Sequence, residues 1–168
     1  MCDAGNGRVV KFGPDGKFLA NYSGSDGTGD GFLKPVDLSI AANGEVYVLE
    51  QIAGEVRVLD AAGQFLRRWG GVNGISDGSL LDGPTGIALL GDGRVALADT
   101  GNHRVVLFDD QGQALVSFGT LGSGSGQLLF PVALVADPGK ALFVAQRGGI
   151  RRPFKPGRCK CRILRHLL

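Results

Sequence analysis

The chain has 168 residues, a length typical of one domain, and 43% of them are hydrophobic. Its 29 glycines are spread along the chain rather than clustered, which favours many short strands joined by tight turns over a disordered low-complexity chain. The net charge of +2 divides unevenly, because residues 1–150 hold all 16 acidic residues and carry −5, whereas residues 151–168 hold seven Lys and Arg. We therefore expect a folded body over 1–150 and a basic, unpatterned tail over 151–168.

The apolar runs are four to six residues long, far below the ~18 that a helix needs to cross a bilayer. The first ten residues lack the charged-then-apolar order of a secretion signal, so we expect a cytoplasmic protein that does not engage a membrane. The three cysteines, Cys2, Cys159 and Cys161, are an odd number at the chain ends and predict no disulfide framework. Cys159 and Cys161 with His166 are residue types that bind zinc, but three ligands in such a tail favour incidental cysteines, and we expect no metal or other cofactor.

Short apolar runs bounded by Gly, Pro, Asn or Asp predict strands throughout, and the 3.6-residue period of a helix is absent. In chain order the predicted strands are Arg8–Phe12, Phe18–Tyr22, Val36–Ile40, Glu45–Leu49, Glu55–Leu59, Phe65–Trp69, Thr85–Leu89, Arg94–Ala98, Arg104–Phe108, Ala114–Phe118, Val132–Ala136 and Ala141–Ala145. Turn signals such as Asn43-Gly44 and Asp92-Gly93 join neighbouring strands into hairpins. These elements predict an all-β fold.

The pattern of strands recurs at long, regular spacing. Marker residues that repeat 47 or 49 positions apart are Pro35, Pro84 and Pro131, and Asp3, Glu50, Asp99 and Gln146. Four short antiparallel strands in about 40–50 residues are the unit of a β-propeller blade. We predict whole blades at about 35–69 and 84–118, the last two strands of a blade before them and the first two strands of another after them.

The position of each strand within a blade follows from its side chains. The first strand of each unit has apolar residues on both faces, so we expect it to lie innermost, beside the central channel. The fourth strand carries Arg67, Arg68 and Ser117 among its apolar residues, as expected of an outer edge that must not pair with other chains.

A denser pattern of marker residues spans residues 84–119. Its members are Pro84, Gly86, Ile87, Ala88, Asp92, Gly93, Ala98, Asp99, Asn102, His103, Arg104, Val105, Phe108, Gly112, Phe118 and Gly119. In these residues the segment resembles an NHL repeat. The pattern is good over 3–22 and partial over 131–150. It is degraded over 35–69, where Glu50, Ala53 and Glu55 replace Asp, Asn and Arg.

The resemblance implies a ring of NHL-type blades, and members of this family usually close a ring of about six. This chain supplies about three blade-equivalents, fewer than the 4–8 of closed propellers. The ring is therefore incomplete: the chain is a fragment of a larger propeller, two copies share one ring of six, or the blades form an open arc. We favour a partial propeller that associates with itself or with a missing half.

The marker side chains are expected to hold turns rather than perform reactions. The turn markers in the two best-matching units are Asp3, Asn6 and Arg8, and Asp99, Asn102 and Arg104. Such Asp and Asn side chains commonly accept bonds from nearby backbone amides. Arg104 is expected to lie over a neighbouring strand or to pair with a carboxylate such as Asp99. For His103 structural and recognition roles weigh about equally, because it sits at a turn tip where it needs no partner.

No nucleophile–His–acid set is visible in the sequence. Some NHL-type propellers are lyases that bind metal through several histidines of the channel, whereas this chain has only His103 and His166. Related lactonases use acidic metal ligands, and Asp37 is the one acid in a first strand. The run Gly122–Gly126 lacks the Lys-Ser/Thr of a phosphate loop. The seven tail charges do not outweigh an acidic body, so nucleic acid is not expected as a partner.

We therefore expect a noncatalytic scaffold that binds protein partners through one loop face. The loops and turns expected on that face are 23–34, 70–83, 119–130, 50–54 and 99–103, and the candidate contact residues are Asn73, Asp77, His103 and Gln127. One alternative is a fragment of a propeller lyase or lactonase, whose metal site another copy completes. Another is the part of a tripartite-motif-like ubiquitin ligase that selects targets or RNA, since no RING or B-box zinc pattern is present.

Overall fold

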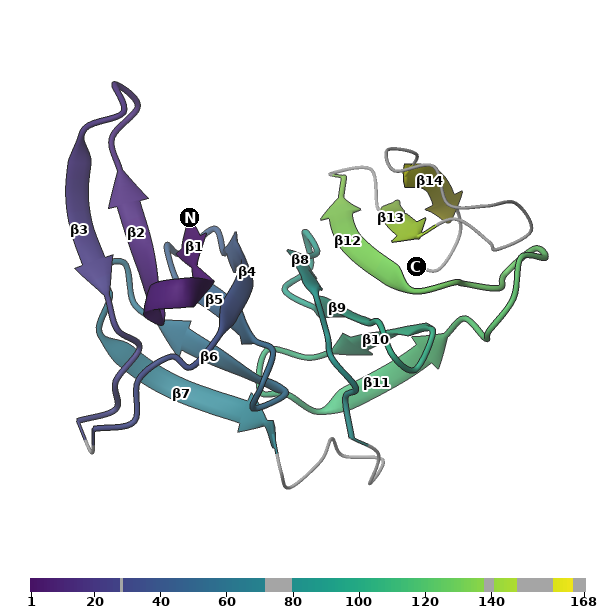
Figure 1. The fold of residues 1–168 in the computed structure, drawn as a ribbon, viewed down its shortest axis with the longest axis horizontal. Helices are drawn as coiled ribbons and strands as arrows, with labels where there is room; N and C mark the ends of the chain where they lie inside the picture. The colour runs from purple at the N-terminus through teal and green to yellow at the C-terminus, as the bar shows by residue number, and fades with distance from the viewer. Residues whose placement is uncertain (28, 72–79, 138–140, 148–158, 165–168) are drawn as a thin grey trace.

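A computed structural model of the chain describes residues 1–27, 29–71, 80–137 and 141–147, and the backbone of 159–164. These residues form four antiparallel sheets that follow one another in an open arc (Figure 1). We number the sheets as blades 1 to 4 in chain order. In the described part of the chain, no helix has the length and apolar character that a membrane span requires.

Blades 2 and 3 are complete four-stranded sheets. Blade 2 has the order β4 (Pro35–Ile40), β5 (Val46–Glu50), β6 (Glu55–Leu59) and β7 (Phe65–Gly70). Blade 3 has the order β8 (Gly86–Leu89), β9 (Val95–Asp99), β10 (Arg104–Phe108) and β11 (Ala114–Phe118). The predicted all-β architecture of four-stranded antiparallel blades in an incomplete ring is confirmed.

The two end sheets are partial. Blade 1 consists of β1 (Cys2–Asp3), the short 3-10 helix η1 (Ala4–Asn6), β2 (Arg8–Phe12) and β3 (Phe18–Tyr22). Blade 4 consists of β12 (Pro131–Ala136), β13 (Leu142–Arg147) and β14 (Cys159–Leu164). By their place in the repeat, β1 to β3 are the end of a second strand followed by a third and a fourth strand, and β12 to β14 are a first, a second and a third strand.

Several sequence-based strands differ from the structure. The first strands of blades 2 and 4 begin one residue earlier than predicted and that of blade 3 one residue later, and the short strand Cys2–Asp3 was not predicted. The second strands of blades 2 and 3 begin one residue later than predicted, because the backbone carbonyls of Glu45 and Arg94 close the preceding hairpin turns. The prediction of a tail without strands is wrong for Cys159–Leu164, whose backbone pairs antiparallel with β13. Cross-strand pairing with an available edge, rather than a local pattern, creates this strand.

The innermost strands lie along the concave side of the arc (Figure 1). In the sheet orders β4 and β8 occupy one edge, and β8 contacts both β4 and β12. The first strands are therefore innermost, as predicted. Asp37 of β4 accepts the backbone N–H of Ile87 in β8 at 2.9 Å, so a polar bond as well as apolar packing joins these neighbouring inner strands.

The core lies between successive blades rather than within one sheet. Val56 and Val58 of blade 2 pack with Val106 and Phe108 of blade 3 in one buried cluster. Because side chains alternate between the two faces of a strand, each blade presents one set to the preceding blade and another to the next. Two further buried clusters are built in the same way, one between blades 1 and 2 and the other between blades 3 and 4.

Candidate functional site

The carboxylate of Asp99 connects three segments of blade 3. It is fully buried at the end of β9. Its Oδ1 accepts the backbone N–H of Asp82 at 2.7 Å. Its Oδ2 accepts Asn102 Nδ2 at 2.9 Å and Arg104 Nε at 2.7 Å. Asp99 thus holds the turn that follows it, through two side chains expected to be turn markers, and also the loop that precedes the blade.

The same connection recurs in the neighbouring blades. Glu50 accepts the backbone N–H groups of Leu33 and Lys34. Gln146 Oε1 accepts the N–H of Leu129 at 3.0 Å. In blades 2, 3 and 4 the acceptor lies 17 residues after the amide of Leu33, Asp82 or Leu129, respectively. We call this bond the loop clamp.

Blade 1 has the same turn markers in a more exposed setting. Asp3 accepts Arg8 Nε at 2.8 Å and Asn6 Nδ2 at 2.9 Å, the arrangement found around Asp99. Hydrogen bonds from Asn6 and Arg8 lower the pKa of the Asp3 carboxyl. Its side chain is 23% exposed, whereas that of Asp99 is fully buried.

Blade 2 departs from the repeat pattern and uses a buried arginine instead. Glu55 occupies the position of Arg104, and Arg57, which is 3% exposed, donates to its Oε1 at 2.6 Å. The guanidinium also donates to the carbonyls of Gly24 at 3.0 Å and Asp30 at 2.6 Å. Arg57 therefore fixes the loop between blades 1 and 2 at two further points.

The turns after the second strands of blades 2 and 3 also contact the chain where it enters the next blade. Gln51 Nε2 donates to the carbonyl of Pro84 at 3.3 Å, and Thr100 Oγ1 donates to the carbonyl of Pro131 at 2.7 Å. Together with the clamps, these bonds connect loops and turns into one continuous rim across blades 2 to 4. We call residues 29–34, 50–54, 80–84, 99–103 and 119–130 the loop rim.

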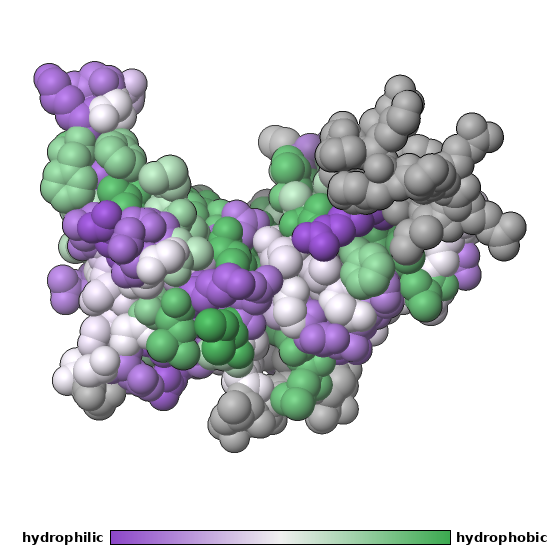
Figure 2. Space-filling view, in the orientation of Figure 1, coloured by the Kyte–Doolittle hydropathy of each residue, from purple (hydrophilic) through white to green (hydrophobic). Residues whose placement is uncertain are grey.

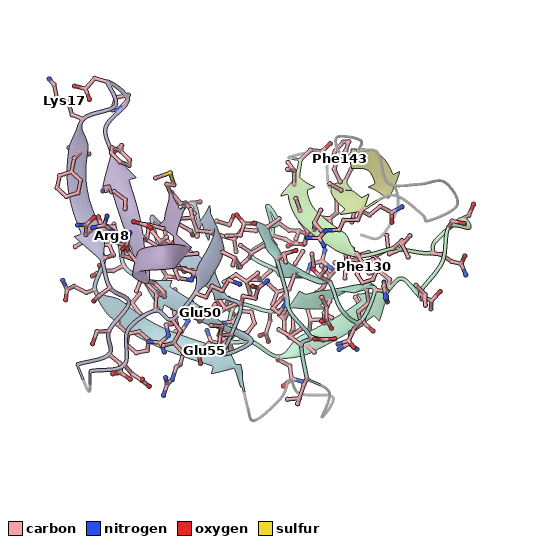
Figure 3. The ribbon with its side chains drawn as sticks, in the orientation of Figure 1. Arg8, Lys17, Glu50, Glu55, Phe130 and Phe143 are labelled. Carbon is pink, nitrogen blue, oxygen red and sulfur yellow. The ribbon has the colours of Figure 1, made fainter. Side chains whose placement is uncertain are left out.

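The loop rim exposes apolar side chains. The large apolar residues of the rim with high exposure are Leu33 at 61%, Ile52 at 66%, Leu80 at 57%, Leu121 at 61% and Phe130 at 36%. Figure 2 shows hydrophobic patches interspersed with hydrophilic side chains on the visible face, and Figure 3 places Phe130 beside the strands of blade 3. Sequence reasoning chose polar loop residues and missed these five.

His103, predicted to need no partner, has one. Its Nδ1 accepts the backbone N–H of Phe130 at 3.1 Å, and the two rings meet edge to face with centroids 4.3 Å apart. Because Nδ1 accepts, the neutral imidazole carries its proton on Nε2. His103 also has φ 55°, where Gly7 and Gly54 occupy the equivalent turn positions, so the ring contact accompanies a backbone conformation that favours glycine.

The other predicted contact residues divide between the loop 119–130 and an undescribed segment. Gln127 is half-buried and accepts the N–H of Gly124 at 2.8 Å, so it shapes its own loop. Asn73 and Asp77 lie outside the described residues, as do His166 and the side chains of Cys159 and Cys161. Within the described residues, no group of three His, Cys, Asp or Glu side chains is placed to hold a metal ion.

One ion pair that includes an outer-strand arginine lies away from the loop rim. Arg67 of β7 donates to Glu45 at 3.1 Å and to the hydroxyl of Tyr47 at 2.8 Å. Arg67 lowers the pKa of the Glu45 carboxyl, and burial raises the pKa of Tyr47. In blade 1, burial raises the pKa of the Cys2 thiol to about 11, which favours the protonated form at neutral pH.

Comparisons with known proteins agree with this geometry. The NHL repeat family matches residues 81–108. No curated protein matches the chain. Virginiamycin B lyase of Staphylococcus aureus superposes with a TM-score of 0.59 at 15% identity, over 84% of this chain and 43% of the lyase. A gluconolactonase of Xanthomonas campestris superposes with a TM-score of 0.61 at 19% identity, over 86% of this chain and 51% of that one.

A streptogramin B lyase gives the same result, with a TM-score of 0.57 at 16% identity, over 82% of this chain and 41% of the lyase. The chain thus spans about two fifths to one half of the length of these structures. At such identities the likeness establishes the fold alone.

Proposed function

Because the chain is a partial β-propeller with an NHL repeat, we propose that it is a noncatalytic scaffold that binds a protein partner through the loop rim. The observation that carries the proposal is the set of five exposed apolar side chains on the rim. They come from loops and turns of consecutive blades, and the loop clamps hold several of these segments in place.

A fixed apolar rim favours protein binding for two reasons. Apolar surface that is removed from water on binding contributes roughly 25 cal/mol per Å². A rim that is already ordered by buried bonds loses little conformational entropy when a partner docks, so more of that gain appears as affinity. On the rim, exposed apolar side chains lie among polar ones. A partner surface with the same mixture of apolar and polar side chains would therefore complement it.

Two acidic side chains of the kind that an enzyme uses, Asp37 and Asp99, accept structural hydrogen bonds instead. Asp37, the one acid of a first strand, accepts the backbone N–H groups of Leu38 and Ile87, each at 2.9 Å. Asp99 accepts three hydrogen bonds. Such carboxylates support a structural role, and the activities of the lyases and the lactonase are not assigned to this chain on the strength of a shared fold.

The test compares rim and edge variants of the full chain. Partners captured from a lysate of the source cells by the unaltered protein are purified, and their affinities are measured for Ile52→Ser and Leu80→Ser. The matched controls are Leu66→Ser and Leu115→Ser, because these leucines are similarly exposed, at 45% and 50%, on the outer strands β7 and β11. We expect the rim variants to weaken binding at least tenfold, about 1.4 kcal/mol, and the controls to leave it unchanged.

Thermal unfolding of all four variants verifies that each remains folded. A purified partner whose affinity is the same for rim and control variants would contradict the proposal, and so would one that depends on Leu66 or Leu115 instead.

A further inference from the structure

The first blade exposes a face that blades 2 and 3 bury. Phe12, Leu59 and Phe108 occupy equivalent positions at the ends of β2, β6 and β10. Leu59 and Phe108 are fully buried against the preceding blade, whereas Phe12 is 46% exposed and meets Phe18, itself 59% exposed, at the free end of the arc. Phe12 is therefore exposed on a face of blade 1 that, in blades 2 and 3, packs against the preceding blade.

A glycine in the same hairpin points to the missing neighbour. In blades 2 and 3, the glycine between the third and fourth strands lies under an aromatic ring of the preceding blade. A Cβ on Gly63 would lie 2.0 Å from Tyr22, and one on Gly112 would lie 2.3 Å from Trp69. The equivalent Gly16 would meet no described atom within 4 Å.

Phe118 of blade 3 is the residue that matches this open glycine. It ends β11 at the position that Tyr22 and Trp69 hold in β3 and β7. The blade that follows it supplies β12, β13 and β14, and in the described residues this sheet contains no fourth strand. Phe118 packs against the cluster between blades 3 and 4, but among the described residues no third-to-fourth-strand turn lies there for it to cover as Tyr22 and Trp69 do. Gly16 offers such a turn, with no described ring over it.

The end sheets are complementary in their outermost positions and overlap in between. Blade 1 contains the end of a second strand, a third and a fourth strand, and blade 4 contains a first, a second and a third strand. The registers agree as well, since Asp3 lies opposite Arg8 in blade 1 and Asp99 lies opposite Arg104 in blade 3. Gln146 is the residue of β13 at the Asp3 and Asp99 position, so it is matched to Arg8.

We infer that two copies of this chain close one ring, in which β2 and β3 of each copy complete the blade begun by β12 and β13 of the other. The chain spans about two fifths to one half of the similar propellers, so two copies supply close to a full circle. The contact is head to tail, and it closes on itself because the same junction occurs twice.

In the closed ring, β2 of one copy pairs with β13 of the other copy. It takes the place that β14 holds beside β13, and β13 in turn takes the place that β1 holds beside β2. Backbone bonds lost with β14 are replaced by bonds to β2, so the ladder itself changes little. The gain is the burial of the apolar face that includes Phe12 and Phe18, together with the packing of Phe118 of one copy on Gly16 of the other. A second copy is thus the occupant that fits both free ends.

An engineered disulfide tests the register of this junction. The pair opposite in the completed blade is Lys11 and Phe143, by analogy with Leu107 and Ala96 in blade 3. Opposed residues of antiparallel strands have Cα atoms about 4.5–5.5 Å apart, within the range of a disulfide. With Cys2, Cys159 and Cys161 changed to Ser, we expect Lys11→Cys/Phe143→Cys to form a covalent dimer on mild oxidation.

The control pair is Lys17→Cys/Phe143→Cys, because Lys17 is exposed at the tip of the same hairpin and lies out of register. A dimer band with the control alone, no disulfide with the Lys11 pair, or a disulfide within one chain would overturn the inference.

Light scattering on the unaltered chain provides the second test. One copy has a mass of 17.5 kDa, so the closed pair has twice that mass. We expect Gly16→Asn to weaken the dimer at least tenfold, because its side chain occupies the space required by Phe118 of the other copy. Gly93→Asn is the matched control, since Gly93 has φ 91° and also no described atom within 4 Å of an added Cβ. A monomer or an open series of larger species would refute closure, and neither result bears on the rim variants.

Discussion

Asp99 receives hydrogen bonds from three directions, and each donor comes from a different part of its blade. The backbone N–H comes from the loop before the blade, and the two side-chain donors come from the turn and from β10. Asp3 has the same two side-chain donors in a more open setting. We therefore expect Asp99 to contribute more to the free energy of unfolding than Asp3. The donors from the turn are the same, and the difference is that Asp99 is buried and also holds the preceding loop.

The substitutions Asp99→Ala and Asp3→Ala measure this difference. We expect Asp99→Ala to reduce the free energy of unfolding by about 3 kcal/mol, because Arg104 and the N–H of Asp82 lose a buried partner. Asp3→Ala removes a partly solvated carboxylate, so its loss of stability is smaller. Urea denaturation of the two variants and the unaltered chain measures the free energies of unfolding. Equal reductions in the two variants would show that burial of the carboxylate is not the cause.

His103 shows where residue-level reading of the sequence ends. Its place in a turn followed from the spacing of Asp99, Asn102 and Arg104, and that placement is correct. Its partner, the N–H of Phe130, lies 27 residues further along the chain in another loop. No local pattern identifies such a partner, although the glycines at the equivalent positions of blades 1 and 2 mark His103 as unusual.

At the scale of elements, the junction between blades depends on an aromatic ring and a glycine. Trp69 at the end of β7 packs on Phe108 of the next blade, with ring centroids 4.9 Å apart. Its ring also covers Gly112, whose φ of 84° suits the turn before β11. The glycine thus serves both the turn and the close approach of two blades.

Replacement of Gly112 by alanine separates these two requirements. Gly112→Ala and Gly93→Ala each place a Cβ at positive φ, which costs about 1 kcal/mol. Only the former places it 2.3 Å from Trp69, so we expect a further ~2 kcal/mol of destabilisation from overpacking. Chemical denaturation measures both variants, and losses of equal size would exclude the ring contact as the reason for glycine.

Most strands were predictable because they carry local signals. Asn43-Gly44 and Asp92-Gly93 fix tight hairpins, and the apolar runs on either side fix the strands. The strand Cys159–Leu164 has no comparable signal and exists because β13 offers an edge. The loop clamp was also beyond sequence reasoning, which expected the marker acids to bind nearby amides rather than amides 17 residues away.

In the whole molecule, the loop clamps and the junctions between blades have separate structural roles. Packing between successive blades builds the arc, and the clamps attach the loops to it at one rim. The sequence predicted the loops of this rim but not its apolar surface, because exposure depends on how neighbouring loops pack. Leu80 and Leu81 illustrate this, since the former is exposed and the latter packs against the core between blades 2 and 3.

The central claim is that one clamp, repeated from blade to blade, fixes the loops of the rim. Hydrogen exchange of the backbone amides of Leu33, Asp82 and Leu129, followed by NMR, tests it most directly. The account predicts that all three amides exchange slowly compared with exposed amides of the same loops, and that Asp99→Ala removes the protection at Asp82 alone. Exchange of the three amides as fast as that of their exposed neighbours would contradict it.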